Sequence, residues 1–145
     1  MDQPNLHNLQ NAGCLRRLIA ATYDWLLVLG LMMLLSVPFV ALLDDAIQPG
    51  NNLYRFGLLL VATIFFSGFW SHGGQTLGMK AWRLQLITTD GAPVSYRRAL
   101  ARFMYACISA LPAGLGFWWQ LWDPDHRSWH DRWSDTIIIL LPKKK

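Results

Sequence analysis

The feature that most constrains this chain is a long apolar run, Leu18 to Leu43, which follows Arg16-Arg17 and contains one charged residue, Asp24. Its 26 residues, at about 1.5 Å of helical rise each, are enough to cross a hydrocarbon core of about 30 Å. The run therefore predicts a transmembrane helix. An acid in such a helix costs roughly 2.5–3.5 kcal/mol on insertion scales, so Asp24 requires a compensating partner.

Composition extends this prediction to the whole chain of 145 residues. Charged residues make up 15% of it, against roughly 25% in a soluble domain, so much of the surface must face lipid. The net charge of +4 lies in the flanks of the apolar runs, which favours anionic lipid headgroups over nucleic acid as the partner. Cys14 and Cys107 lie in different parts of this pattern, and we expect both to stay reduced.

We expect a mainly α, polytopic membrane protein that forms a single domain over residues 1–145. Its predicted parts are a first helix over 12–43 that ends or bends at Pro38, a second helix over 53–72, a polar connector over 73–98, a broken third element over 95–122 and a tail over 123–145. The Lys and Arg residues before the first helix and in the connector place both on the cytoplasmic side by the positive-inside rule.

Two short stretches predict a cytoplasmic strand pair. Residues 82–88 alternate in polarity before a turn, and residues 136–141 form a β-branched run before Pro142. Lone strands are unstable, so these two should pair, which places the tail on the same side as the connector. A straight third helix over 99–122 would instead place the tail on the opposite side. Pro112 breaks that run, so it is either a third span or a re-entrant hairpin, and the strand pairing favours the hairpin.

Three separated stretches carry a resemblance. They are Ala12-Gly13-Cys14-Leu15-Arg16-Arg17-Leu18-Ile19-Ala20-Ala21-Thr22-Tyr23-Asp24, Gln75-Thr76-Leu77-Gly78-Met79-Lys80 with Trp82-Arg83-Leu84, and Trp129-His130-Asp131-Arg132-Trp133-Ser134-Asp135-Thr136. Together they resemble the RDD family of small membrane proteins, named for an arginine at the start of the first helix, an aspartate within it and a second aspartate. The resemblance runs from about Gly13 to Ile139. Together with the orientation given by the positive-inside rule, we expect a multi-pass protein of a bacterial-type cytoplasmic (inner) membrane with a cytoplasmic N-terminus.

By position, the resemblance implies that the family arginine is Arg17 and the first aspartate Asp24. The second aspartate is Asp131, with Asp135 as the alternative, and we expect supporting roles for Arg16, Arg102 and His130. The family's general molecular role is not established, although cation/proton exchange has been proposed for some relatives.

The same residues indicate a charge network. Arg17 and Asp24 are seven residues apart, hence about 10.5 Å apart along the helix axis, so they should not touch. Matching depths predict two other pairs, Asp24 with Arg102 and Arg17 with Asp131. Asp24 is then either part of a structural clasp or an acid that exchanges a proton or binds a cation.

A metal or catalytic site finds little support. His126 and His130 are four residues apart with Asp123 nearby, and zinc is conceivable on a helix. There is no nucleophile elbow, no phosphate-binding glycine loop and no His-Glu-x-x-His motif, so we expect no enzyme, no cofactor and no metal.

Two functions remain open. The first is a non-enzymatic scaffold, assembly factor or partner subunit, whose partner is another membrane protein or a second copy of the chain. The alternative is a proton-coupled monovalent cation transporter that acts as an oligomer. Because the acids gather near one face of the membrane and the second helix has no ionisable residue beyond Arg55, the first reading is favoured.

Overall fold

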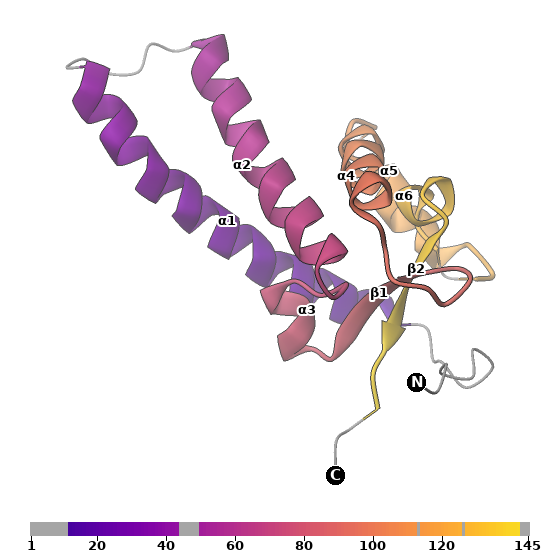
Figure 1. The fold of residues 1–145 in the computed structure, drawn as a ribbon. Helices are drawn as coiled ribbons and strands as arrows, with labels where there is room; N and C mark the ends of the chain where they lie inside the picture. The colour runs from indigo at the N-terminus through magenta and orange to yellow at the C-terminus, as the bar shows by residue number, and fades with distance from the viewer. Residues whose placement is uncertain (1–11, 44–49, 113, 126, 143–145) are drawn as a thin grey trace.

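Two long helices dominate the computed structural model, which describes residues 12–43, 50–112, 114–125 and 127–142. Helix α1 covers Cys14–Leu43 and α2 covers Asn52–Ser71, and they lie side by side (Figure 1). Both are long and apolar enough to cross a membrane, which confirms the two predicted spans. The chain stays helical through Pro38 to Leu43, so the expectation of a helix end there is wrong.

Contacts along their length hold α1 and α2 together. Near the end where α1 stops and α2 begins, the hydroxyls of Ser36 and Tyr54 lie 2.7 Å apart. Further along, Val28 of α1 is buried with Ala62 and Phe66 of α2. Phe103, which follows much later in the chain, joins the same apolar cluster. Through Phe103, the third apolar segment packs against the first two helices.

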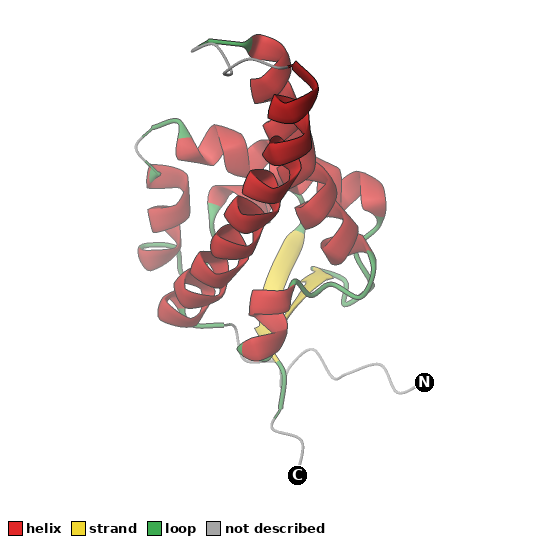
Figure 2. Cartoon of the chain, turned by 90° about the vertical axis from the view of Figure 1, so that its left-hand side faces the viewer, coloured by secondary structure: helices red, strands yellow, loops and turns green. Residues whose placement is uncertain are grey.

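The predicted strand pair is present at the other end of the molecule. Strand β1 (Leu84–Thr88) pairs antiparallel with β2 (Thr136–Leu140), from Leu84 opposite Leu140 to Thr88 opposite Thr136. Helix α3 (Leu77–Ala81) precedes β1 and packs on α1. The backbone N–H of Ala12 donates to the carbonyl of Ile138 at 3.1 Å, so the start of the first helix is attached to the sheet. Figure 2 shows the two strands among the helices at this end.

The third apolar segment is broken, as Pro112 predicts. Helix α4 (Tyr96–Ala110) is followed by α5 (Leu115–Trp118) and the 3-10 turn η2 (Trp119–Leu121), and the two halves are bent by 109°. Gly114 adopts a φ of 76° at the break, a conformation that glycine tolerates readily. A Cβ on Gly116 would lie 2.5 Å from the Cβ of Ser109, so the glycine allows α5 to fold closely onto α4.

The strand pairing constrains the path of this segment. Residues 89–135 leave β1 and return to its neighbour β2. The segment therefore starts and ends at the end of the molecule that carries the sheet. A single crossing of a membrane would separate the strands. The geometry therefore favours the re-entrant hairpin over a third span. Helix α6 (Trp129–Trp133) lies on the returning half and packs against α4.

Candidate functional site

Three charged side chains meet where α1, α4 and α6 converge. Asp131 Oδ2 accepts from Arg17 Nη1 at 2.9 Å, and Asp131 Oδ1 lies 2.5 Å from Arg102 Nη2. The exposed fractions are 9% for Arg17, 2% for Arg102 and 0% for Asp131. One buried carboxylate thus bridges two buried guanidinium groups from elements far apart in the sequence.

Each of the two arginines also contacts neutral groups of the protein. Arg17 also donates to Gln120 Oε1 and to the carbonyl of Ile138, each at 3.3 Å. Arg102 donates to Thr136 Oγ1 at 2.5 Å, and its guanidinium carbon lies 5.2 Å from the centre of the Trp70 ring, a cation–π geometry. The network therefore joins both long helices, the broken segment and β2.

The carboxylate of Asp131 is oriented by its own short helix. The backbone N–H of Ser128, the residue before α6, donates to Asp131 Oδ2 at 3.1 Å. This is one half of a capping box, in which an acid three residues into the helix accepts from the N-cap backbone. The sequence Ser128-Trp129-His130-Asp131 thus orients the acid through contacts of its own helix, independently of the two arginines.

The electrostatics of this cluster follow from its burial. Burial alone would raise the pKa of Asp131, but the positive charges of Arg102 and Arg17 hold it well below its usual range. Burial, with the nearby charge of Arg102, lowers the pKa of His130 to about 3. Asp131 is therefore ionised and His130 neutral at physiological pH, with the imidazole Nε2 lying 2.9 Å from Ser128 Oγ.

Asp24 occupies a separate site further along α1, where the helix contacts the start of α3. Its Oδ2 accepts from the Thr76 hydroxyl at 2.5 Å and its Oδ1 from the Gly78 backbone N–H at 2.9 Å. Thr76 is the N-cap of α3, where its oxygen also accepts from the Met79 N–H at 3.2 Å. Asp24 is only 3% exposed, so both of its oxygens serve to attach α3 to the first helix.

A glycine makes this attachment possible. A Cβ on Gly78 would collide with the carbonyl oxygen of Ala20 and would lie 3.0 Å from the Asp24 carboxylate. The backbone of α3 can therefore approach α1 closely only at a residue without a side chain. Gly74, in the turn before α3, has a φ of 70°, and a Cβ there would likewise collide with a backbone carbonyl oxygen, that of Leu86.

The structure separates the predicted site residues into these two groups. The ion pair expected between Arg17 and Asp131 is present. The pair expected between Asp24 and Arg102 is wrong, because Arg102 is directed at Asp131 and Asp24 at the amino end of α3. Arg16 is half-buried and takes part in no ion pair among the described residues.

Two further candidates stand apart from the network. Asp135 is exposed in a turn with a φ of 49° before β2, so Asp131 is the aspartate that contacts the arginines. His126 lies outside the described residues, and Asp123 pairs with Arg132 at 3.3 Å. Within the described ranges, no three metal-ligand side chains gather into a cluster.

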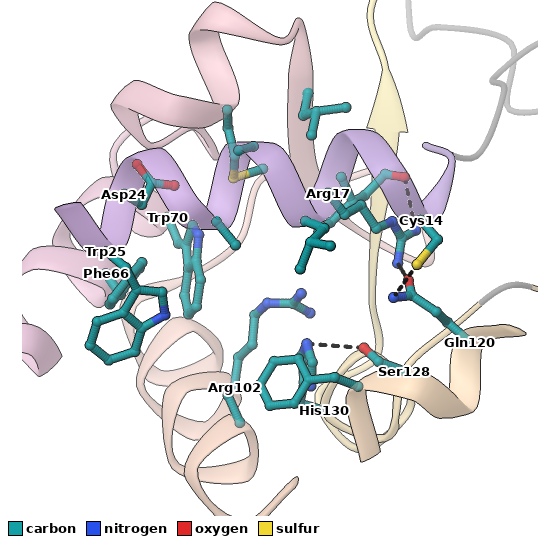
Figure 3. A pocket seen from close by; sticks show the side chains of 18 of the residues that line it. Cys14, Arg17, Asp24, Trp25, Phe66, Trp70, Arg102, Gln120, Ser128 and His130 are labelled. Atoms are coloured by element: carbon teal, nitrogen blue, oxygen red, sulfur yellow. Dashed lines mark hydrogen bonds between the residues drawn. The ribbon is translucent and has the colours of Figure 1, made fainter. Parts of the chain in front are cut away.

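A pocket of about 210 Å³ lies between the two groups, with residues from both long helices, α4 and α5 in its wall. Figure 3 shows Arg17, Arg102 and His130 toward one end and Asp24, Trp25 and Phe66 toward the other. The pocket is mainly apolar, and its charged residues belong to the ion network or to the α3 attachment.

The sequence analysis assigned no role to several residues that contribute to the site. Thr76, Gly78, Ser128, Thr136 and Trp70 all contact a charged member of the site. A usable signal existed for the first two, since a buried acid in a helix requires donors and Thr76 precedes a short helix as an N-cap would. No local signal marks Trp70 or Thr136, which reach the site only through the tertiary fold.

Comparison with known proteins gives one match. The model of the RDD family matches residues 11–135, which is most of the chain. No curated protein and no solved structure matches it.

Proposed function

The chain belongs to the RDD family and is an integral membrane protein, and we propose that it acts as a non-enzymatic scaffold, assembly or partner subunit whose charges clasp its helices. The observation that carries this proposal is Asp131, which is fully buried and bridges Arg17 and Arg102. A paired, hydrogen-bonded charge needs no ligand to account for it, because leaving any member unpaired would be strongly destabilising.

The outer surface of α1 supports a role in assembly. Only 6% of the residues in its most apolar 18-residue stretch are buried within the chain. Met33 and Leu34 are 73% and 68% exposed. In a membrane such a surface is covered by lipid or by another helix. We propose that a helix of another membrane protein, or of a second copy, packs on this face.

We further propose that the protein lies in a bacterial-type cytoplasmic membrane with its N-terminus and its strand pair on the cytoplasmic side. The cations of the chain support this orientation, because Arg16, Arg17 and Lys80 belong to the end that carries the sheet (Figure 1). By the positive-inside rule this end faces the cytoplasm.

Transport is the second candidate, and one observation favours it. Asp24 is a buried acid in a membrane-spanning helix and lines the pocket, as a proton or cation carrier would. Against it, both oxygens of Asp24 already accept hydrogen bonds from the protein. A clasp between α1 and α3 accounts for these contacts without transport.

Site-specific photo-crosslinking in native membranes tests the proposal. A photoreactive residue at Leu34 should give one protein adduct of defined mass, with either a partner or a second copy of the chain. The same residue at Met104, which is 50% exposed on α4, is the control for non-specific capture. Lipid adducts alone at Leu34, or the same protein adduct at both positions, would contradict the proposed assembly role.

A further inference from the structure

The pocket in Figure 3 has the wall of a site for an alkyl chain. Its volume of about 210 Å³ exceeds the roughly 150 Å³ of an apolar cavity that accommodates benzene. The wall is built largely from aromatic and aliphatic side chains of α1, α2, α4 and α5, among them Trp25, Phe66, Phe103 and Phe117. A hydrated ion would lose its water against such a wall, whereas methylene groups gain by being buried there.

One end of the pocket carries an uncompensated positive charge. Arg17 and Arg102 share the single carboxylate of Asp131, and their other acceptors are neutral. No second acid lies within ion-pair distance of either arginine in the described part of the chain, and His130 is neutral. The buried cluster therefore retains a net charge of one, which an anion would neutralise.

The same end contains polar atoms that lack partners. Arg17 Nε, Arg102 Nε and His130 Nδ1 are buried without a hydrogen-bond partner among the described residues, as is Asp131 Oδ1, which is ion-paired with Arg102. Asp24, the acid that would repel an anion, lies toward the other end with its oxygens bonded to Thr76 and Gly78 (Figure 3).

We propose that this pocket binds a long-chain carboxylate, with its acid group beside Arg17 and Arg102 and its alkyl chain along the aromatic wall. The single negative charge matches the single uncompensated positive charge. The volume holds the acid end of one chain, and because the pocket is open on one side, the rest of the chain can extend out of it. This ligand role goes beyond the proposed scaffold function and does not depend on it.

Binding to purified, delipidated protein in a neutral detergent tests the proposal. Native mass spectrometry should show one hexadecanoate retained per chain. Hexadecanol, which has the chain without the charge, should bind about tenfold or more weakly, a difference of about 1.4 kcal/mol. Inorganic phosphate, which has the charge without the chain, should not bind.

Two pairs of variants locate the site. Arg17→Gln removes the uncompensated charge but leaves the pair of Arg102 with Asp131, so it should reduce hexadecanoate binding to the level of hexadecanol. Arg16→Gln, at the adjacent arginine outside the network, should change nothing. Ala106→Phe fills the pocket and should abolish binding, whereas Ala110→Phe on the same helix, outside the pocket lining, should not.

Three results would overturn the proposal. Equal binding of hexadecanol and hexadecanoate would mean that the charge plays no part. Binding that survives both Arg17→Gln and Ala106→Phe would place the ligand elsewhere. Retention of phosphatidylglycerol but not of hexadecanoate would mean that the ligand is an anionic two-chain phospholipid rather than a free carboxylate. A cooperative thermal unfolding transition, with its midpoint above the temperature of the binding assay, verifies that each variant is folded.

Discussion

Removing Asp131 should do more harm than removing either arginine, and removing Arg17 as well should repair part of the damage. In Asp131→Asn the two guanidinium groups of Arg17 and Arg102 face each other with no anion between them. Both are nearly inaccessible, at 9% and 2% exposure. Breaking a buried ion pair by deleting one partner costs about 3–5 kcal/mol, and we expect a loss in that range.

Arg17→Gln has a different electrostatic outcome. It leaves Arg102 and Asp131 as a neutral pair, with Oδ1 still 2.5 Å from Nη2. The expected cost is the loss of charged hydrogen bonds, about 1.5–3 kcal/mol. In the double variant Arg17→Gln/Asp131→Asn only one buried cation remains, so repulsion disappears. Its free energy of unfolding should therefore exceed that of Asp131→Asn alone by about 1 kcal/mol or more.

A double-mutant cycle on detergent-solubilised protein measures this effect. Denaturant unfolding followed by tryptophan fluorescence gives the four free energies. Arg132→Gln supplies the matched control, because Arg132 pairs with Asp123 at 3.3 Å and is 50% exposed, where such pairs contribute about 0–1 kcal/mol. If the costs of Arg17→Gln and Asp131→Asn simply add within about 0.5 kcal/mol, the shared-carboxylate account is refuted.

Three further predictions concern other parts of the site. Asp24→Asn can keep an oxygen for the Gly78 N–H and should lose little stability, whereas Asp24→Leu leaves that donor unsatisfied and should cost about 1–3 kcal/mol, measured by the same unfolding assay. Gly78→Ala should destabilise the protein and expose α3 to proteolysis because its Cβ meets the Ala20 carbonyl, while Gly57→Ala, with nothing within 4 Å of its Cβ, should not. The pKa of His130 falls from 6.5 in the unfolded chain to about 3 in the folded chain, so below pH 6.5 only the unfolded state gains this proton and stability should fall with pH toward 3, by up to about 1.4 kcal/mol per pH unit. His130→Gln should flatten the unfolding free energy between pH 6.5 and 4.5, and an unchanged slope would show that another group is responsible.

Much of the architecture follows from one-dimensional patterns. Apolar run length predicts both spans, Pro112 predicts the break, and the β-branched stretch before Pro142 predicts that β2 pairs with β1. These signals are local, since each depends on residues that are neighbours in sequence. Pro38 is the exception, because α1 continues through it to Leu43.

The charge network was only half predictable for a geometric reason. Depth along a helix can be counted from sequence, and it correctly paired Arg17 with Asp131. The direction in which a side chain leaves its helix depends on how the helices are rotated against each other, which the count does not contain. Asp24 and Arg102 have similar expected depths but face different neighbours, α3 in one case and α6 in the other.

The claim that the buried charges hold the fold, rather than carry ions, is tested most directly by cation-driven proton movement in proteoliposomes. The natural sequence and Asp24→Asn are compared at matched incorporation, with protein-free vesicles as the baseline. The clasp account predicts that neither protein moves protons above this baseline. Proton movement that Asp24→Asn abolishes without lowering thermal stability would contradict it and identify Asp24 as a carrier.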